Sequence, residues 1–256
     1  MFRFFRLLIK NTSILRKTIY VPSYWFVNHV VRYRSILLQR HGATILSKVN
    51  DLSRQHSVDV YPTFGTLLGL IRDGRLMKHD FDMDFAILPS ATNLSVFFAE
   101  LQKEGFYFEW METVDDCLTE VRFRYKELTI DFFLHSFTAD RNKMMMIQTD
   151  SETRRYEYPR VDFLIDHSVL GLNLRIPNNY EEYLTSMYGA WNIVIKSGWS
   201  STMAPCFIGV NDPSQYSITT SFSSSVFLRW IDTHQHFPRL ADKGYAVYSK
   251  SNVLCS

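Results

Sequence analysis

The stretch at residues 64–85 reads FGTLLGLIRDGRLMKHDFDMDF and combines two short periodic patterns. Its first half has the apolar spacing of a short amphipathic helix, predicted over residues 65–72 and ended at Gly74. Its second half alternates acidic and apolar residues and predicts a strand over residues 81–88. A helix N-terminus and a row of carboxylates are therefore expected close together.

Three aspartates, Asp80, Asp82 and Asp84, occupy alternate positions of the strand-like half. Successive side chains of a strand point to opposite faces, so the three carboxylates would share one face. Like charges at this spacing repel one another unless a cation lies between them. Because carboxylate oxygens suit hard divalent cations, the pattern predicts a Mg²⁺ or Mn²⁺ site. The alternative is a solvated strand face without an ion.

A fourth acid, Asp131, interrupts an apolar strand predicted over residues 128–135. An unpaired charge in such a strand is costly. If this strand lies beside that of Asp82, Asp131 is predicted to be a further metal ligand or a general base. The alternatives are a solvent-facing aspartate on an edge strand, or one paired with Arg122 or Arg124.

Gly65, Thr66 and Arg72 form a candidate phosphate site. Backbone N–H groups at a helix N-terminus bind anions, and a glycine lets them approach a phosphate closely. An arginine nearby neutralises phosphate charge. Together with a carboxylate-held metal, these are the parts of metal-assisted phosphoryl transfer.

The flanking sequence predicts alternating helices and strands, so the fold class is α/β (α+β). A long helix is expected over residues 25–55, with a soft interruption at Gly42. Further expected elements are strands at 58–62, 118–125, 128–135 and 144–148, and helices at 92–104 and 180–188. A tight turn at Lys126 and Glu127 joins two of these strands. Little structure is predicted after residue 197.

The quoted residues resemble the LicD/fukutin-like family of nucleotidyltransferase-fold phosphotransferases. Residues 65–69 match its Gly-Thr-Leu-Leu-Gly, and Arg72 matches the arginine that follows. The aspartate triplet matches its Trp-Asp-x-Asp-x-Asp, with His79 in place of the aromatic residue. A second family motif is similar to residues 177–191, PNNYEEYLTSMYGAW. The resemblance covers roughly residues 40–195.

The resemblance implies a nucleotidyltransferase-like core with a short mixed sheet flanked by helices. The implied domain spans residues 25–195, between a basic segment at 1–24 and a C-terminal extension at 196–256. The implied metal ligands are Asp82 and Asp84.

The resemblance also assigns the remaining site residues. Asp131 would help deprotonate the acceptor hydroxyl, while Gly65, Thr66 and Arg72 would stabilise the phosphates. Asp80 and Asp131 remain candidate metal ligands from the residue pattern itself.

The activity implied is transfer of a phosphocholine- or ribitol-phosphate-like group from a CDP-linked donor to a sugar hydroxyl. The acceptor would be a surface glycan, lipopolysaccharide or capsule. Two alternatives stay open: a nucleotidyltransferase that adds NMP to a protein or small molecule, and a non-catalytic binding protein of glycan assembly. Retention of three mutually repelling acids argues against the second alternative.

The net charge of +2 hides a strong asymmetry. Residues 1–50 contain nine of the 28 lysines and arginines and no acid, leaving 19 bases against 26 acids elsewhere. The basic segment predicts contact with an anionic membrane surface, or a terminal helix packed on the body with solvated cations. Nucleic acid is not an expected partner, because the basic residues lie outside the candidate site.

The expected location is the cytoplasm, with peripheral contact at the inner face of the cytoplasmic membrane. The three cysteines form no disulfide framework, which favours a reducing compartment. No apolar run approaches the ~20 residues that span a bilayer.

Overall fold

The computed structural model describes residues 15–89, 93–149, 152–195, 199–211 and 216–233. These form a mixed α+β fold, as the sequence predicts. A six-stranded sheet has the order β1-β2-β5-β4-β3-β12. In that order its strands are Val60–Pro62, Asp82–Ile87, Leu128–Leu134, Cys117–Tyr125, Tyr107–Val114 and Ile218–Ser221. The β2–β5 pair is parallel and the other pairs are antiparallel.

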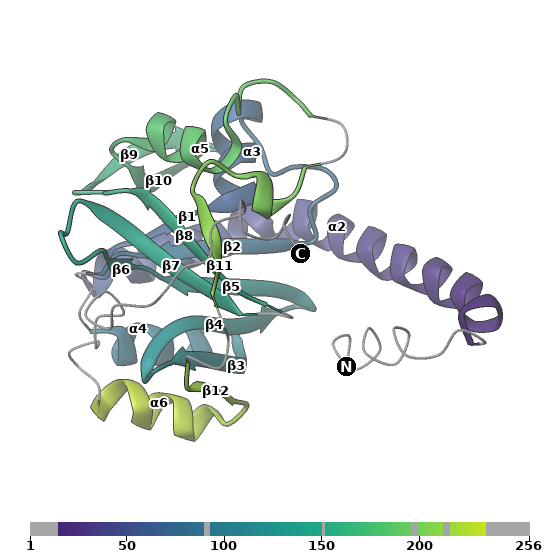
Figure 1. The fold of residues 1–256 in the computed structure, drawn as a ribbon, viewed down its shortest axis with the longest axis horizontal. Coiled ribbons are helices and arrows are strands. Elements are labelled where there is room, and N and C mark those ends of the chain that lie inside the picture. Colours follow the sequence, from purple (N-terminus) through teal and green to yellow (C-terminus); the bar gives the residue numbers. More distant parts are fainter. Residues whose placement is uncertain (1–14, 90–92, 150–151, 196–198, 212–215, 234–256) are drawn as a thin grey trace, which may run out of the picture.

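One face of this sheet is covered by α2 (Leu15–Gln55), α4 (Leu94–Lys103) and α6 (Ser224–Thr233). Figure 1 shows α4 and α6 on the side of the sheet away from α3 and α5. Met83 and Phe85 of β2 point into the apolar core between the sheet and these helices. The period of two therefore turns Asp82 and Asp84 to the opposite face.

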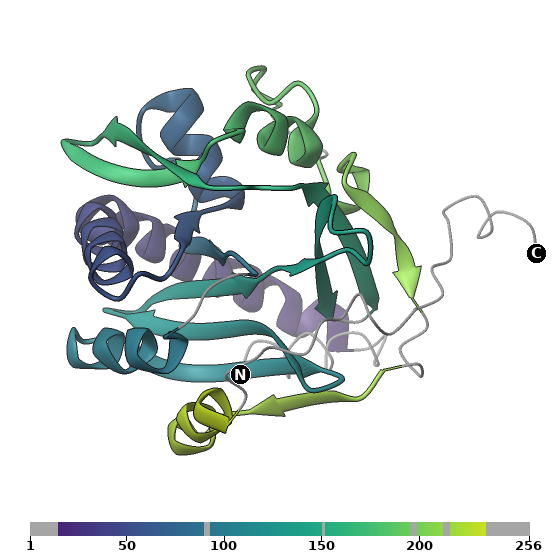
Figure 2. The same ribbon diagram turned by 90° about the vertical axis from the view of Figure 1, so that its left-hand side faces the viewer.

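A second sheet and two helices lie on that opposite face. The sheet has the order β11-β8-β7-β6, and Figure 2 shows its strands running across those of the first sheet. In that order its strands are Phe207–Asn211, Thr153–Pro159, Lys143–Thr149 and Ser136–Phe137. The helices are α3 (Phe64–Asp73) and α5 (Tyr180–Tyr188). A hairpin of β9 (Leu164–Val169) and β10 (Leu172–Pro177) leads into α5.

The predicted long helix is confirmed as α2, which begins earlier and runs unbroken past residue 24. Gly42 does not interrupt it: a Cβ there would lie 2.1 Å from Cδ1 of Leu76, so the glycine allows close packing. Figure 1 shows the N-terminal part of α2 projecting from the body. The first ten residues, expected at a membrane interface, lie outside the described residues. Among the described helices, none is both long enough and apolar enough to cross a membrane.

Beyond residue 197, where the sequence pattern assigns little structure, the structure contains further elements. A short 3-10 helix, η1 (Ser201–Met203), β11, β12 and α6 all form there. Phe227 of α6 is fully buried and its ring stacks on that of Phe108 at 4.6 Å. These elements are short, so their sequences show little helical or strand periodicity. Contacts with β3, β8 and α4 hold them in place.

The two predicted strands at 118–125 and 128–135 are confirmed as β4 and β5. Lys126 and Glu127, which join them, both have positive φ, 45° and 68°. This is the backbone of a type I′ hairpin turn, usually occupied by Asn or Gly. The tight turn brings β4 directly beside β5.

Candidate active site

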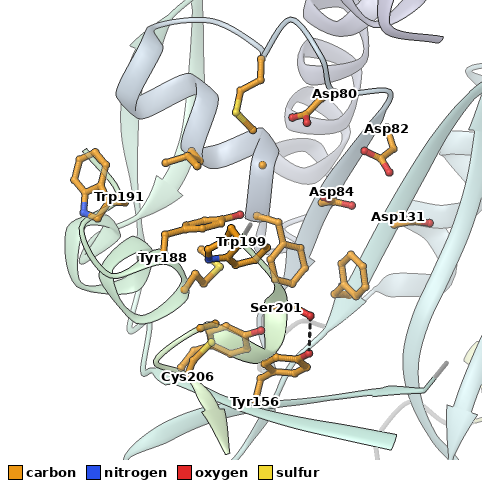
Figure 3. A pocket seen from close by; sticks show the side chains of 18 of the residues that line it. Asp80, Asp82, Asp84, Asp131, Tyr156, Tyr188, Trp191, Trp199, Ser201 and Cys206 are labelled. Carbon is orange, nitrogen blue, oxygen red and sulfur yellow. Dashed lines mark hydrogen bonds between the residues drawn. The ribbon is translucent and has the colours of Figure 1, made fainter. Parts of the chain in front are cut away.

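Three neighbouring strands bring the acidic residues together. Asp84 of β2 lies directly opposite Asp131 of β5, and Asp131 lies opposite Arg122 of β4. The prediction that the Asp131 strand lies beside the Asp82 strand is thus confirmed. Asp80 differs from expectation, because β2 begins at Asp82 and Asp80 lies in the preceding turn. All four acids line one cavity and lie along one side of it (Figure 3).

The N-terminus of α3 is attached to β2 by two hydrogen bonds. The Thr63 amide donates to the Asp84 carbonyl at 2.9 Å, and the Asp84 amide donates to Thr66 Oγ1 at 3.0 Å. The Thr66 hydroxyl therefore holds the strand that carries Asp82 and Asp84, a role that the sequence did not reveal. Phe64 starts the helix with φ of 46°, a strained value for a residue with a side chain.

Gly65 lies close to the side chain of Asp80. A Cβ at this position would lie 2.9 Å from Asp80 Oδ2. The glycine thus lets the helix N-terminus approach a carboxylate of the site. Gly65 and Thr66, for which the sequence predicts anion binding, lie in the first turn of α3, where amides lack partners within the helix.

The carboxylates are crowded enough to alter their protonation. Burial, followed by the charges of Asp131 and Asp80, raises the pKa of Asp82 to about 7. Burial and the charge of Asp82 raise the pKa of Asp84 well above its ordinary value. Burial also raises the pKa of Asp80. Negative charge on this face is therefore costly unless a cation accompanies it.

Asp82 and Asp84 are suited to hold a divalent cation. Among the described residues, none forms a hydrogen bond or ion pair with the side-chain oxygens of either. In the described part of the chain, no three His, Cys, Asp or Glu side chains are arranged as a complete metal site. Mg²⁺ commonly takes only one or two carboxylates, with water and substrate phosphates completing its shell. The two free carboxylates fit that kind of site.

Asp131 is engaged by an arginine. Arg122 donates to both carboxylate oxygens of Asp131, from Nε at 2.5 Å and from Nη2 at 2.8 Å. The guanidinium also lies 4.9 Å from the Trp110 ring centroid and 3.5 Å from Glu120 Oε1. Burial raises the pKa of Asp131, while the Arg122 hydrogen bonds oppose the rise. Of the alternatives that the sequence left open, the pairing with Arg122 is present.

The candidate phosphate ligand Arg72 is also paired. It donates to both oxygens of Asp73, at 2.8 and 2.9 Å, while its side chain lines the cavity. This pair fixes the direction of the guanidinium at the edge of the acidic cluster. The charge of Asp80 also acts on Arg72.

The second sequence motif meets the first through a buried polar chain. Tyr183 of α5 lies with its hydroxyl 3.0 Å from Thr63 Oγ1 and 3.5 Å from the Tyr61 hydroxyl. The Tyr61 hydroxyl in turn lies 3.2 Å from Nδ1 of His135. Burial lowers the pKa of His135 to about 3, so the imidazole is neutral. This series of polar contacts holds the N-terminus of α3 in place through Thr63.

The cavity has a volume of about 800 Å³ and extends far beyond the carboxylates. Aromatic side chains form much of the facing side, including Tyr188, Trp191 and Trp199 (Figure 3). The Tyr188 and Trp199 rings lie 5.0 Å apart. Sequence reasoning missed several polar lining residues, namely Glu120, Gln148 and Arg154. No local pattern distinguishes them, because they share the cavity only through tertiary packing.

Comparison with known families agrees with this geometry. Residues 57–179 match the family described as LicD/FKTN/FKRP, nucleotidyltransferase domain. This region of the chain is a LicD/fukutin-like domain. The matched region runs from just before β1 to the start of α5, so it includes every acid of the cluster. No curated protein matches the chain.

Family membership supports a transferase of phosphate-containing groups that acts on glycans or related substrates. The match ends before Tyr188, Trp191 and Trp199, which also line the cavity. Part of the LicD-like site is therefore built by residues beyond the matched region.

Proposed function

We propose that this LicD-like protein transfers a phospho-alcohol from a CDP-linked donor to a sugar hydroxyl, with Mg²⁺ or Mn²⁺ as cofactor. The observation that carries the proposal is the placement of Asp82 and Asp84, whose side chains have no partner among the described residues, beside the α3 N-terminus in a cavity of about 800 Å³. Metal ligands, anion-binding amides and space for a nucleotide-linked substrate thus meet in one place. The acceptor would be a surface glycan, lipopolysaccharide or capsule.

In this proposal Asp82 and Asp84 hold the metal, with Asp80 nearby as a further carboxylate. The bound metal supplies Lewis-acid neutralisation of the donor pyrophosphate. The amides of Gly65 and Thr66 bind phosphate oxygens at the helix N-terminus, and Arg72 adds positive charge at the edge.

The acceptor hydroxyl oxygen forms a bond to the phosphorus that bears the alcohol. The bond from that phosphorus to the bridging oxygen breaks, and CMP leaves with the electron pair. Asp131 takes the hydroxyl proton. Both its oxygens accept hydrogen bonds from Arg122, so the proton is taken by a remaining lone pair of one oxygen.

A thermal-shift panel tests the proposal on wild type and Asp82→Asn. CDP, UDP, ADP and GDP are each added with and without Mg²⁺ or Mn²⁺. A ligand at a hundred times its Kd stabilises the folded state by about 2.7 kcal/mol, or roughly 5–10 °C for a chain of this size. The expected result is a metal-dependent shift with CDP that Asp82→Asn abolishes. Asp51→Asn, an exposed carboxylate on α2, is the matched control.

The other outcomes of this thermal-shift panel would support the two alternative functions. A shift with ADP in place of CDP would support transfer of a nucleotide. No shift with any nucleotide would support a non-catalytic role in glycan assembly. Transfer activity that survives Asp82→Asn would refute the metal role of this residue.

The proposal includes peripheral contact with the inner face of an anionic membrane. Its support is the charge of residues 1–50, which carry nine lysines and arginines and no acid. Each basic residue near an anionic surface contributes about 1 kcal/mol. Co-sedimentation with phosphatidylserine vesicles but not with phosphatidylcholine vesicles is the expected result, and equal binding to both would refute the electrostatic contact.

A further inference from the structure

Strands β7 and β8 contribute further polar side chains to the lining of the cavity. Gln148 of β7 lies directly opposite Arg154 of β8. Two residues along each strand, Met146 lies opposite Tyr156. All four side chains line the cavity. Since strand side chains alternate, these four lie on the same face of the second sheet. A cationic and an amide side chain thus adjoin an apolar floor within the same cavity as the acidic cluster.

Arg154 differs from the other two arginines of the cavity. Arg72 and Arg122 each donate two hydrogen bonds to one carboxylate, so their guanidinium groups are neutralised in place. Within the described residues, Arg154 forms one polar contact, from Nη2 to Glu152 at 3.3 Å, and the Glu152 side chain is 55% exposed. The Arg154 Nε is buried and has no hydrogen-bond partner in the part of the chain that the structure describes. A guanidinium has five N–H donors, so most of those of Arg154 are unused.

The side-chain amide of Gln148 also has hydrogen-bonding groups that no described residue uses. Within the described part of the chain, its side-chain amide forms no hydrogen bond. The amide is half-buried on the cavity wall. Polar groups placed at such a wall normally find a partner, because leaving them unpaired costs free energy. An arginine and an amide with free donors, side by side, match the oxygens of a carboxylate or phosphate group.

We propose that Arg154 and Gln148 form a subsite that binds an anionic group, a carboxylate or phosphate, on the acceptor glycan. The assignment to the acceptor rests on the proposed function. In that function the two donor phosphates are taken by the metal-binding acids, the α3 N-terminus and Arg72. Arg154 belongs to the other sheet, so its anionic ligand is a separate group. The acceptor class is therefore an acidic or phosphorylated sugar.

Ligand-detected NMR titrations at matched ionic strength test the subsite without any reaction. The probes are glucuronate, glucose 6-phosphate and neutral glucose, with CDP plus Mg²⁺ titrated separately. The variants are Arg154→Gln and Gln148→Ala. Arg155→Gln is the matched control: Arg155 is the next residue of β8, is 20% exposed against 22% for Arg154, and pairs with Glu157 on the opposite face of the sheet.

The two anionic sugars should bind wild type more tightly than glucose does. Arg154→Gln should weaken them roughly tenfold to a hundredfold, as expected for loss of a hydrogen bond to a charged group. Gln148→Ala should weaken them less, and Arg155→Gln should leave them unchanged. Binding of CDP with Mg²⁺ should be the same in all variants.

Three results would overturn the subsite. These are equal binding of glucose and glucuronate, unchanged binding of anionic sugars by Arg154→Gln, and loss of CDP binding in Arg154→Gln. The last would place Arg154 at the donor. The sugar titrations contain no nucleotide, so their outcome does not depend on the outcome of the CDP titration. Failure of CDP binding in wild type would remove the proposed donor and leave the anionic subsite intact.

Discussion

Asp82→Asn should stabilise the protein in the absence of metal. Crowding and burial raise the pKa of Asp82 from 3.8 to about 7, which corresponds to about 4 kcal/mol at 1.36 kcal/mol per pH unit. The side chain keeps some solvent contact and shares its protonation with its neighbours, so about half of this, ~2 kcal/mol, is expected. For a chain of this size, that is roughly 4–8 °C in Tm.

The effect has a definite pH dependence. A carboxyl whose pKa is raised in the folded state binds its proton more tightly there than in the unfolded chain. Its favourable contribution is present at low pH and is lost as the pH rises through about 7. The variant should therefore exceed wild type at pH 8 and approach it near pH 5, where Asp82 is protonated.

The assay is thermal or urea unfolding in EDTA at several pH values, repeated with Mg²⁺. Mg²⁺ should stabilise wild type at pH 8 and have little effect on Asp82→Asn, because the variant lacks one ligand. Asp51→Asn should show neither the stabilisation nor the loss of the metal response. A variant that is less stable than wild type at pH 8 in EDTA would refute the reasoning, since Asp82 would then have a stabilising partner.

Three further substitutions test how the site is built. Gly65→Ala should push a Cβ to 2.9 Å from Asp80 Oδ2, displacing the carboxylate and weakening the Mg²⁺-dependent thermal shift. Thr66→Val should cost about 1–3 kcal/mol by leaving the Asp84 amide unpaired, whereas Thr66→Ser should cost less; urea unfolding compares the two. Phe227→Ala should cost about 3–5 kcal/mol in the same measurement, and a negligible loss would show that α6 is dispensable to the fold.

The short-range pattern of residues 64–85 was enough to predict much of the site. Periods of two and of 3.6 residues predicted β2 and α3, and they placed Asp82 and Asp84 on the face away from the apolar core. The sequence also offered Arg122 as one of two partners for Asp131. These inferences succeed because side-chain direction along a strand or helix depends mainly on local backbone geometry.

Tertiary structure decided which distant residues join that local unit. The register of β2, β5 and β4 set Asp131 between Asp84 and Arg122, and Thr66 was found to hold Asp84 through its hydroxyl. Arg154 lines the cavity because β8 packs across it, a contact that no spacing in the chain encodes. The sequence by itself determined the chemistry of the carboxylate strand. Only long-range packing, which depends on the summed burial of many apolar side chains, determined the shape and the far wall of the cavity.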